Sequence, residues 1–330
     1  MKSKPVIAIF AGGYSGEHAV SIRSAKGIAS WIDRNLFRPF IYVIEREKWY
    51  ILHDDDSRQD ITKGNIRFEL DGETIYPDYA YITIHGTPGE DGILQGYLDT
   101  LGIPYNTGSV LTEALTFNKF ACNRYLSSFP GIRTAKSLRL VGGESDQKIM
   151  EGVAELGGYP VFIKPNTGGS SVATSRIERA EDVLPAVRTA FAESSEVMIE
   201  ALIQGVEVTC GVYERDGIPT ILEITEVVTK NSFFDFDAKY NGAVEEITPA
   251  RIPSEQAKLI REQTLAIYNY VQARGIIRID YIIEDDGYPT LLEVNTTPGM
   301  TTTSFIPQQV AAAGLQMPEV LTHIINSTIK

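Results

Sequence analysis

The strongest constraint on the fold of this chain is a β-hairpin pattern in residues 275–295. Two β-patterned runs flank Asp286-Gly287, a dipeptide favoured in two-residue type I′ turns. With that turn, Asp285 faces Tyr288, and counting back along both strands places Asp280 directly opposite Glu293. A four-residue loop centred on the same dipeptide keeps this pairing, whereas a three-residue loop does not. The sequence therefore predicts two carboxylates side by side on one sheet.

Strand alternation extends this pair into a polar face. The same register pairs Arg278 with Asn295, and the two-residue period puts both on the side of Asp280 and Glu293. Facing carboxylates, roughly 5 Å apart, repel unless a cation lies between them. Mg²⁺ binds carboxylate and amide oxygens together with substrate phosphates, so we prefer a metal–phosphate site to an exposed face with screened repulsion. The opposite side is predicted to be apolar, with Ile277, Ile279, Tyr281, Leu292 and Val294.

Strand and helix patterns alternate over the first hundred residues. Residues 5–10 form an apolar run typical of a buried parallel strand, residues 11–16 interrupt it, and an amphipathic helical pattern follows. Two more strand patterns and a second helical pattern come before residue 101. This order predicts an open parallel α/β domain.

The rest of the chain follows a different pattern. A long helix is expected from Ser109 to Leu126, and mixed strands and helices follow it. Because 330 residues exceed the usual size of one hydrophobic core, we expect more than one domain. The predicted fold class is α/β, with the open parallel domain followed by two α+β subdomains. The predicted domains are residues 1–112, 113–200 and 201–330.

Composition limits the classes of function. A net charge of −13 without a basic run argues against a nucleic-acid binder, and 43% apolar with 22% charged residues is typical of a globular protein. No apolar run approaches the roughly 18 residues of a membrane span, and the N-terminus lacks the features of a signal peptide. We therefore expect a cytoplasmic protein, and small anionic substrates stay possible because a few local cations can outweigh a diffuse negative surface. Cys122 and Cys210 lie among apolar residues, which favours core positions.

Two glycine-containing loops are candidate binding segments. Lys164 ends an apolar strand pattern directly before the loop at 166–171, where backbone N–H groups can bind anions. The lysine precedes the glycines, so this is not a Walker A motif, and a plain surface turn is an equal alternative. Residues 11–16 do not match GxGxxG, which argues against a dinucleotide-binding oxidoreductase. Glu17 is expected at the start of a helix, where helix capping would explain a carboxylate. His85 is expected at the end of a parallel strand, where a structural role and a functional role are equal alternatives.

In their order along the chain, these motifs resemble the D-alanine–D-alanine ligase family of the ATP-grasp superfamily. The resemblance runs nearly end to end, and the ordered set is far more specific than any single motif. It implies an ATP-grasp fold and an ATP-dependent ligase that forms D-alanyl-D-alanine for peptidoglycan precursors. The matching segments are residues 12–21, 85–96, 104–105, 118–119, 164–165, 169–172, 238–240, 278–280 and 293–301.

The resemblance implies an ATP site and two Mg²⁺ ions, which Mn²⁺ can replace. Lysines would hold the phosphates under the glycine-rich loop, and a later strand would contact adenine and ribose. The implied ATP-binding residues are Lys119, Lys164, Gly169, Ser170, Ser171, Glu200, Ala201, Ile203, Glu207 and Lys239. The implied metal ligands are Asp280, Glu293 and Asn295, which lie on the polar face predicted from the hairpin.

The resemblance also implies two D-alanine sites. Glu17 would bind the ammonium of the first D-alanine and, with Ser170 and Tyr240, would position residues 233–241 over the site. These three residues and Arg278 are the implied catalytic residues. The implied substrate-binding residues are Glu17, His85, Lys239, Tyr240, Arg278, Gly299, Ser304 and Phe305.

The implied reaction proceeds through an acyl phosphate. ATP would phosphorylate the carboxylate of the first D-alanine, and the amine of the second would attack the acyl carbon and expel phosphate. Lysines, arginine and Mg²⁺ supply the charge neutralisation that phosphoryl transfer needs. Because acyl phosphates hydrolyse readily, we expect a lid that excludes water, and residues 227–248 are the candidate because they lack clear periodicity.

The chain departs from frequent family residues at three places. Ala201 stands where lysine is frequent, Thr167-Gly168 where Arg-Glu is frequent, and Phe305 where leucine is common. These differences leave the nucleotide affinity and the shape of the second substrate site open. Lys239-Tyr240 favours a dipeptide product over a D-lactate ester, whereas D-serine stays open as second substrate. A non-catalytic nucleotide-binding protein is disfavoured because the candidate metal and phosphate ligands are all present, and the family leads us to expect a homodimer.

Overall fold

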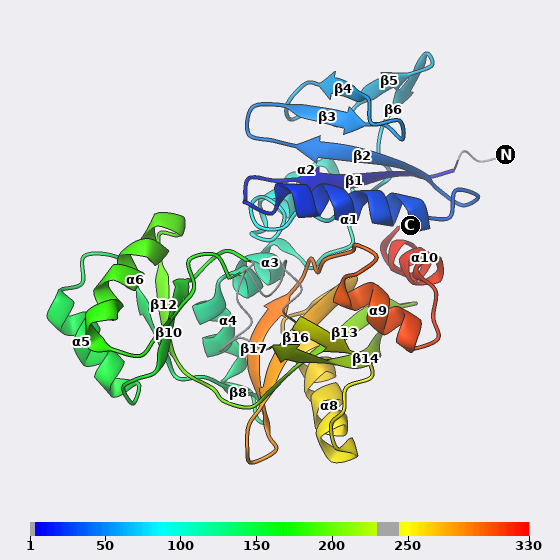
Figure 1. Cartoon of the computed structure of the whole chain (residues 1–330). Coiled ribbons are helices and arrows are strands. Elements are labelled where there is room, and N and C mark those ends of the chain that lie inside the picture. The colour runs from blue at the N-terminus through cyan, green and yellow to red at the C-terminus, as the bar shows by residue number, and fades with distance from the viewer. Residues whose placement is uncertain (1–3, 170, 230–243, 330) are drawn as a thin grey trace.

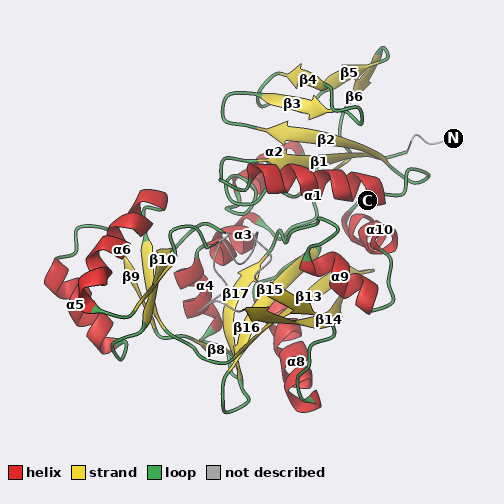
Figure 2. Cartoon of the chain, in the orientation of Figure 1, coloured by secondary structure: helices red, strands yellow, loops and turns green. Residues whose placement is uncertain are grey.

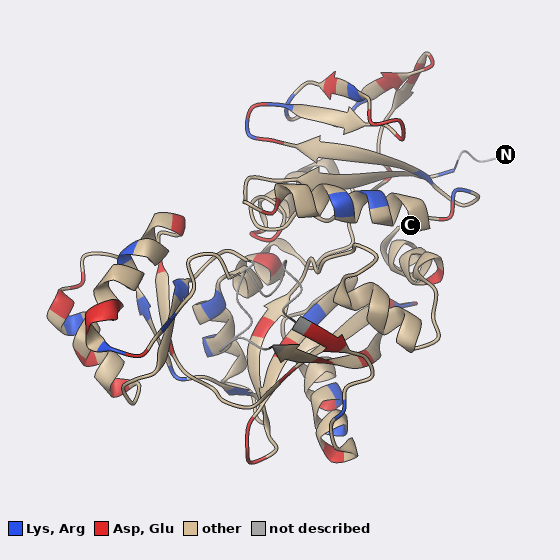
Figure 3. Ribbon diagram, in the orientation of Figure 1, with Lys and Arg blue, Asp and Glu red and all other residues tan. Residues whose placement is uncertain are grey.

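The computed structural model describes residues 4–169, 171–229 and 244–329. Three large β-sheets with their covering helices make up the molecule, and Figure 1 shows them at the top, at the left and at the lower right. No helix in these described ranges is long and apolar enough to cross a membrane. Acidic and basic residues are interspersed on helices such as α5 (Asp146–Glu155), α6 (Ala180–Glu193) and α8 (Ser254–Tyr270), as Figure 3 shows.

The first sheet has a parallel centre and an antiparallel edge. β1 (Val6–Gly12) pairs in parallel with β2 (Arg38–Ile44) and with β7 (Tyr79–Ile82), as the alternation of strands and helices predicts. β3 (Trp49–Leu52) and β4 (Arg58–Ile61) extend the sheet from β2 in antiparallel fashion, which the sequence analysis did not predict.

Strand β1 is buried on both faces. Its alternate side chains pack against α1 (His18–Trp31) and α10 (Met317–Thr328) on one face and against α2 (Ile93–Leu101) on the other. This two-sided burial explains the uninterrupted apolar run of residues 5–10. A short separate hairpin joins β5 (Phe68–Leu70) to β6 (Glu73–Ile75).

The second sheet is antiparallel and is covered by two helices (Figure 2). Its core contains alternate residues of the strands and the apolar faces of α5 (Asp146–Glu155) and α6 (Ala180–Glu193). The glycine-rich loop lies between two adjacent strands of this sheet. In spatial order the strands are β11 (Ser175–Ile177), β10 (Val161–Pro165), β12 (Val197–Ala201) and β9 (Ser137–Leu140).

The long helix expected from Ser109 to Leu126 is in fact two helices. α3 (Val110–Phe117) ends at Asn118, and α4 (Lys119–Leu126) begins directly after it. The Asn118 side chain accepts a hydrogen bond from the third backbone N–H of α4, so the same residue ends one helix and caps the next. Asparagine is among the preferred N-cap residues for this reason.

The third sheet has six strands, with helices on both faces. α8 (Ser254–Tyr270) packs on one face, and α9 (Phe305–Ala312) contacts β13 and β14. In spatial order the strands are β15 (Val244–Ile247), β14 (Ile218–Thr229), β13 (Val206–Arg215), β16 (Ile276–Ile283), β17 (Pro289–Asn295) and β8 (Arg133–Thr134).

The β16–β17 hairpin keeps the predicted pairing at the polar face but reaches it differently. Asp280 faces Glu293 and Arg278 faces Asn295, as predicted. The expected two-residue turn is wrong, because Glu284 pairs with Tyr288 across a three-residue loop. A β-bulge between the Asp280–Glu293 and Tyr281–Leu291 pairs compensates for the shifted register.

The same bulge corrects one predicted core residue. Leu291 is 1% exposed and belongs to the core beside Tyr281, whereas Leu292, which was expected on that face, is only partly buried. Ile277, Ile279, Tyr281 and Val294 are all in this core, as predicted.

Candidate active site

Asp280 is the centre of a polar cluster on the third sheet. Its Oδ1 accepts hydrogen bonds from Arg278 Nε at 2.8 Å and from Thr209 Oγ1 at 2.5 Å. Its Oδ2 accepts from Arg278 Nη2 at 2.8 Å and from Asn295 Nδ2 at 3.0 Å. Asp280 is only 7% exposed, and the guanidinium compensates the cost of burying its charge.

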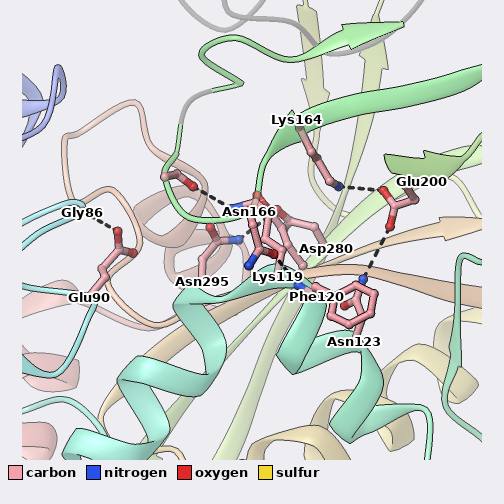
Figure 4. Close-up of polar contacts among 12 residues, drawn as sticks. Gly86, Glu90, Lys119, Phe120, Asn123, Lys164, Asn166, Glu200, Asp280 and Asn295 are labelled. Carbon is pink, nitrogen blue, oxygen red and sulfur yellow. Dashed lines mark hydrogen bonds and ion pairs between the residues drawn. The ribbon is translucent and has the colours of Figure 1, made fainter. Parts of the chain in front are cut away.

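Lys119 brings the glycine-rich loop and the polar face together. Its Nζ donates to the carbonyl oxygen of Gly168 at 2.6 Å and lies 3.7 Å from Glu293 Oε2. The start of α4 is fixed by Asn166, whose Oδ1 accepts from the backbone N–H of Phe120 at 2.9 Å (Figure 4). One lysine therefore contacts both a phosphate-loop candidate and a metal-ligand candidate.

Lys164 and Glu200 form a buried ion pair. Lys164 Nζ is 2.7 Å from Glu200 Oε2, and the two side chains are 12% and 3% exposed. Figure 4 shows Lys164 pointing at Glu200, with Asn123 of α4 on the other carboxylate oxygen at 3.5 Å. The backbone N–H of Ala201 donates to the carbonyl of Lys136 at 2.9 Å, so the sheet already uses this N–H.

Glu17 lies against the glycine-rich loop. A Cβ atom added to Gly169 would lie 2.5 Å from Glu17 Oε2, so the glycine permits this close approach. The Glu17 side chain makes no capping hydrogen bond at the start of α1, although capping was the structural explanation for it. The loop and the first helix, which are far apart in sequence, therefore meet at one carboxylate.

His85 and Glu90 lie in the loop that follows β7. His85 is 7% exposed, and its Nε2 atom has no hydrogen-bond partner within the part of the chain that the structure describes. Glu90 Oε2 accepts from the backbone N–H of Gly86 at 2.6 Å (Figure 4). Burial raises the pKa of the Glu90 carboxyl, and the neighbouring His85 offsets part of this shift.

Four residues expected at the second substrate site lie together. The Arg278 guanidinium lies over the Phe305 ring, 5.2 Å from its centroid. Ser304 precedes α9, and its Oγ accepts from the backbone N–H of Thr301 at 3.1 Å. A Cβ atom added to Gly299 would lie 3.0 Å from Ser304 Oγ, so the loop before α9 folds closely over this residue.

The charge balance of the polar face suits a cation. Burial alone lowers the pKa of Arg278, but Asp280, Glu293 and Glu207 outweigh burial and the pKa rises, so Arg278 stays charged. No three His, Cys, Asp or Glu side chains gather into a metal cluster in the described ranges. Two carboxylates and the Asn295 amide oxygen nevertheless match the ligands of Mg²⁺ when phosphate oxygens complete the shell.

Two family comparisons cover almost the entire chain. The sequence matches the D-ala D-ala ligase N-terminus family over residues 6–109 and the D-ala D-ala ligase C-terminus family over residues 131–326. The chain belongs to the D-alanine–D-alanine ligase family. A D-alanine–D-alanine ligase from Porphyromonas gingivalis is 59% identical over 322 residues, or 98% of this chain and 97% of that protein. One from Parabacteroides distasonis is 50% identical over 329 residues, or 99% of this chain and 98% of that protein.

Solved structures of ligases share the fold. A D-Ala:D-Ser ligase from Enterococcus faecalis superposes with a TM-score of 0.87 at 29% identity, covering 98% of this chain and 99% of that chain. A D-alanine–D-alanine ligase from Bacillus anthracis complexed with ATP gives a TM-score of 0.75 at 25% identity, covering 98% and 96%. These comparisons confirm the expected ATP-grasp fold, and ATP is a substrate of the family.

Some of the remaining residues implied by the ligase resemblance are described by the structure, and others are not. Ser171 has a positive φ of 55° in the glycine-rich loop, Ile203 follows β12, and Glu207 on β13 is close enough to Arg278 to affect its pKa. Ser170, Lys239 and Tyr240 lie outside the described residues, as do positions 230–243 of the expected lid.

The sequence analysis missed Thr209 and Asn166. Thr209 is paired with Asp280 across β13 and β16, and this contact depends on a strand order that the sequence does not reveal. Asn166 belongs to the glycine-rich loop that was singled out, but its contacts with α4 arise only in the folded chain. The sequence signal that could have identified Asn166 as a site residue was its position two residues after Lys164.

Proposed function

We propose that this chain is an ATP- and Mg²⁺-dependent ligase that joins two D-alanine molecules into D-alanyl-D-alanine for peptidoglycan precursors. The observation that carries the proposal is the convergence of Lys119, Glu293 and Asp280 beside the glycine-rich loop. This arrangement supplies cationic and metal-binding groups where a triphosphate can lie. The 59% identical relative named D-alanine–D-alanine ligase supports the choice of substrate.

In the proposed ATP site, Lys119 and Lys164 neutralise phosphate charge. Lys119 lies at the start of α4 and donates to Gly168 of the glycine-rich loop, and Lys164 lies on β10, the strand that leads into this loop. Glu200 and the Ala201–Ile203 backbone are assigned to adenine, and Glu207 to the ribose. The Ala201 N–H already donates to the carbonyl of Lys136. The adenine contact is therefore assigned to other backbone atoms of residues 201–203.

Asp280, Glu293 and Asn295 are the proposed ligands of two Mg²⁺ ions, which Mn²⁺ can replace. When bound, such ions polarise the phosphates and offset charge that develops during phosphoryl transfer. Arg278 holds Asp280 in place through two hydrogen bonds and stays charged beside the developing negative charge. Thr209 fixes the same carboxylate from the neighbouring strand.

Two separate amino-acid sites are proposed. Glu17 binds the ammonium of the first D-alanine, near His85, and the roles of Ser170, Lys239 and Tyr240 remain as the resemblance implies. Arg278, Gly299, Ser304 and Phe305 enclose the second D-alanine, whose amine attacks the acyl phosphate.

D-serine is the second candidate for the acceptor. The E. faecalis D-Ala:D-Ser ligase superposes with a TM-score of 0.87, so the fold alone does not separate the two products. The high identity to proteins named D-alanine–D-alanine ligase favours D-alanine.

The deciding experiment is phosphate release from Mg-ATP by the purified chain, with D-alanine alone and then with D-serine or D-lactate added. Release that requires D-alanine, together with the D-alanyl-D-alanine product, is expected. A mixed product as the major species would change the acceptor. ATP binding without release under any condition would overturn the ligase assignment in favour of a non-catalytic nucleotide-binding protein.

We also propose the domains 1–112, 113–200 and 201–330, a cytoplasmic location and a homodimer. One large sheet in each range supports the domains, although β8 of the second range pairs with β17 of the third.

We assign the dimer surface to two exposed apolar side chains on the contacting helices α2 and α3. These are Ile93, which is 61% exposed, and Leu111, which is 75% exposed. Light scattering tests the assembly, and a monomeric mass would contradict it.

A further inference from the structure

Glu113 is a fully buried carboxyl group that the proposed reaction does not use. It lies on α3 and is 0% exposed. Its Oε1 accepts from the backbone N–H of Gly108 at 2.9 Å, and its Oε2 accepts from Thr296 Oγ1 at 2.6 Å. In the described part of the chain, neither oxygen takes part in an ion pair. Burying a carboxyl group without a cation is costly, which makes a purely incidental position hard to explain.

Thr296 is the first residue after the strand that ends at Asn295, a proposed metal ligand. The loop that begins there leads through Gly299, which is assigned to the second substrate. Glu113 is separated from Thr296 by 183 residues, so their hydrogen bond joins the start of the second proposed domain to the catalytic loop of the third. In Figure 1, α3 lies between the N-terminal layer and β17.

Two further contacts hold the same loop from the N-terminal side. Thr297 Oγ1 donates to the carbonyl of Ile84 at 3.4 Å, and the backbone N–H of Met300 donates to Ser24 Oγ at 3.2 Å. Ser24 lies on α1, two turns after Glu17. A Cβ atom added to Gly27 on the same helix would lie 2.6 Å from the Met300 carbonyl oxygen, so α1 and the loop are in close contact.

We infer that Glu113 is a positioning residue that, through Thr296, holds residues 296–300 in the geometry that acceptor binding and metal coordination require. The inference rests on the proposed ligase function. Among the contacts on this loop, the one from Glu113 to Thr296 is nearest to Asn295, so it fixes the start of the loop. A small displacement there moves both Asn295 and Gly299, and misplacement by about 1 Å can reduce a rate 100-fold.

The test compares variants that remove the contact with one that preserves it. Glu113→Leu and Thr296→Val remove one partner each, whereas Glu113→Gln keeps an oxygen for Gly108 and a polar group facing Thr296. The control is Thr116→Val, because Thr116 is also buried on α3 but its hydroxyl donates to carbonyls of its own helix. Dipeptide formation against D-alanine concentration gives separate apparent KM values for the donor and acceptor sites.

Glu113→Leu and Thr296→Val are expected to raise the acceptor KM and the Mg²⁺ concentration for half-maximal rate by about tenfold or more, with the donor KM within about twofold of wild type. Glu113→Gln should recover most of this loss, and Thr116→Val should show none of it. If the first two variants lower only the melting temperature and match Thr116→Val in both constants, the positioning role is wrong. If the wild type forms no dipeptide, the proposed function fails and this inference fails with it.

Discussion

At the scale of single residues, three buried carboxylates near the site are stabilised in three different ways. Asp280 has a guanidinium on both oxygens, Glu200 has the ammonium of Lys164, and Glu113 accepts from the Gly108 N–H and the Thr296 hydroxyl, which are neutral donors. The hydrogen bonds to Glu113 favour its charged form, but burial outweighs them and raises the pKa of its carboxyl group. The three carboxylates should therefore respond differently to substitution.

Thr209→Val should weaken Mg²⁺ activation by about 10- to 100-fold, because groups that orient a metal ligand commonly have effects of this size. The substitution is nearly isosteric and removes the hydroxyl that donates to Asp280. The measurement is the Mg²⁺ concentration that gives half-maximal ligation at saturating ATP. Thr220→Val on the next strand is the matched control, since its hydroxyl donates to the carbonyl of Ile218. Equal effects of the two substitutions would contradict a role for Thr209 in orienting Asp280.

Glu113→Gln should make the chain more stable relative to wild type as pH rises. Burial, despite the hydrogen bond from Thr296, raises the pKa of the Glu113 carboxyl well above the ordinary 4.5. The stability that protonated Glu113 contributes to the folded chain is therefore fully present below the pKa that this group has in the unfolded chain. This stability is lost as pH rises through the pKa that the group has in the folded chain. The amide does not titrate and lacks this dependence.

Urea unfolding at about pH 5 and about pH 8 measures this difference. The free energy of unfolding of the variant, minus that of wild type, should increase between the two values. A difference that is constant with pH would mean that Glu113 is charged throughout this range, against the effect of its burial.

At the scale of elements, the hairpin shows how far sequence reasoning reaches. Alternation placed Asp280 and Glu293 on one face, but their direct pairing was counted from a two-residue turn and is found only because a β-bulge offsets the longer loop. The loop length was not recoverable from Asp286-Gly287. Gly287 has a positive φ of 78°, and a left-handed glycine suits the last position of a three-residue loop as well as a type I′ turn. The bulge that restores the register has no distinct signal in the sequence.

Alanine substitutions on β17 test the observed register. Leu291→Ala should lower the free energy of unfolding by about 2–5 kcal/mol, because Leu291 is 1% exposed in the core. Leu292→Ala should cost about 1 kcal/mol or less, since its side chain is only partly buried. Chemical denaturation of both variants provides the measurement. The reverse order would support the two-residue turn that the sequence predicts.

The break between α3 and α4 has a similar cause. Apolar periodicity continues across residues 109–126, so the pattern resembles one helix. Asn118 interrupts it because its side chain satisfies a backbone N–H of the second helix. Lys119 then occupies the first position of a new helix, where its side chain can reach Gly168 and Glu293.

At the scale of the whole molecule, the candidate site is assembled from all three sheets. Glu17 lies in the connection between β1 of the first sheet and α1. Lys164 and Glu200 belong to the second sheet, and Asp280 and Glu293 belong to the third. The motifs and their order predicted the family and the fold. The resemblance brought Glu17 near Ser170 of the glycine-rich loop, whereas the contact between Glu113 and Thr296 was beyond prediction because it depends on how separately patterned units pack.

Because the site spans the sheets, Mg-ATP should stabilise the folded chain as a whole. At a free concentration 100 times its Kd, one bound nucleotide raises the free energy of unfolding by about 2.7 kcal/mol. Asp280→Asn should lose most of this gain by weakening metal-dependent binding. Asp285→Asn, the same change at the exposed tip of the same hairpin, should retain it. Thermal unfolding with and without Mg-ATP measures the effect, and equal gains in both variants would exclude Asp280 from the nucleotide–metal site.

The two hydrogen bonds from Arg278 to Asp280 also bear on metal binding. Both carboxylate oxygens are held by a guanidinium, so a divalent ion bound by Asp280 would compete with a cation that is part of the protein. Metal binding would then weaken a hydrogen bond between Arg278 and Asp280. The N–H group of Arg278 that this frees would be available to the negative charge that develops in the proposed reaction.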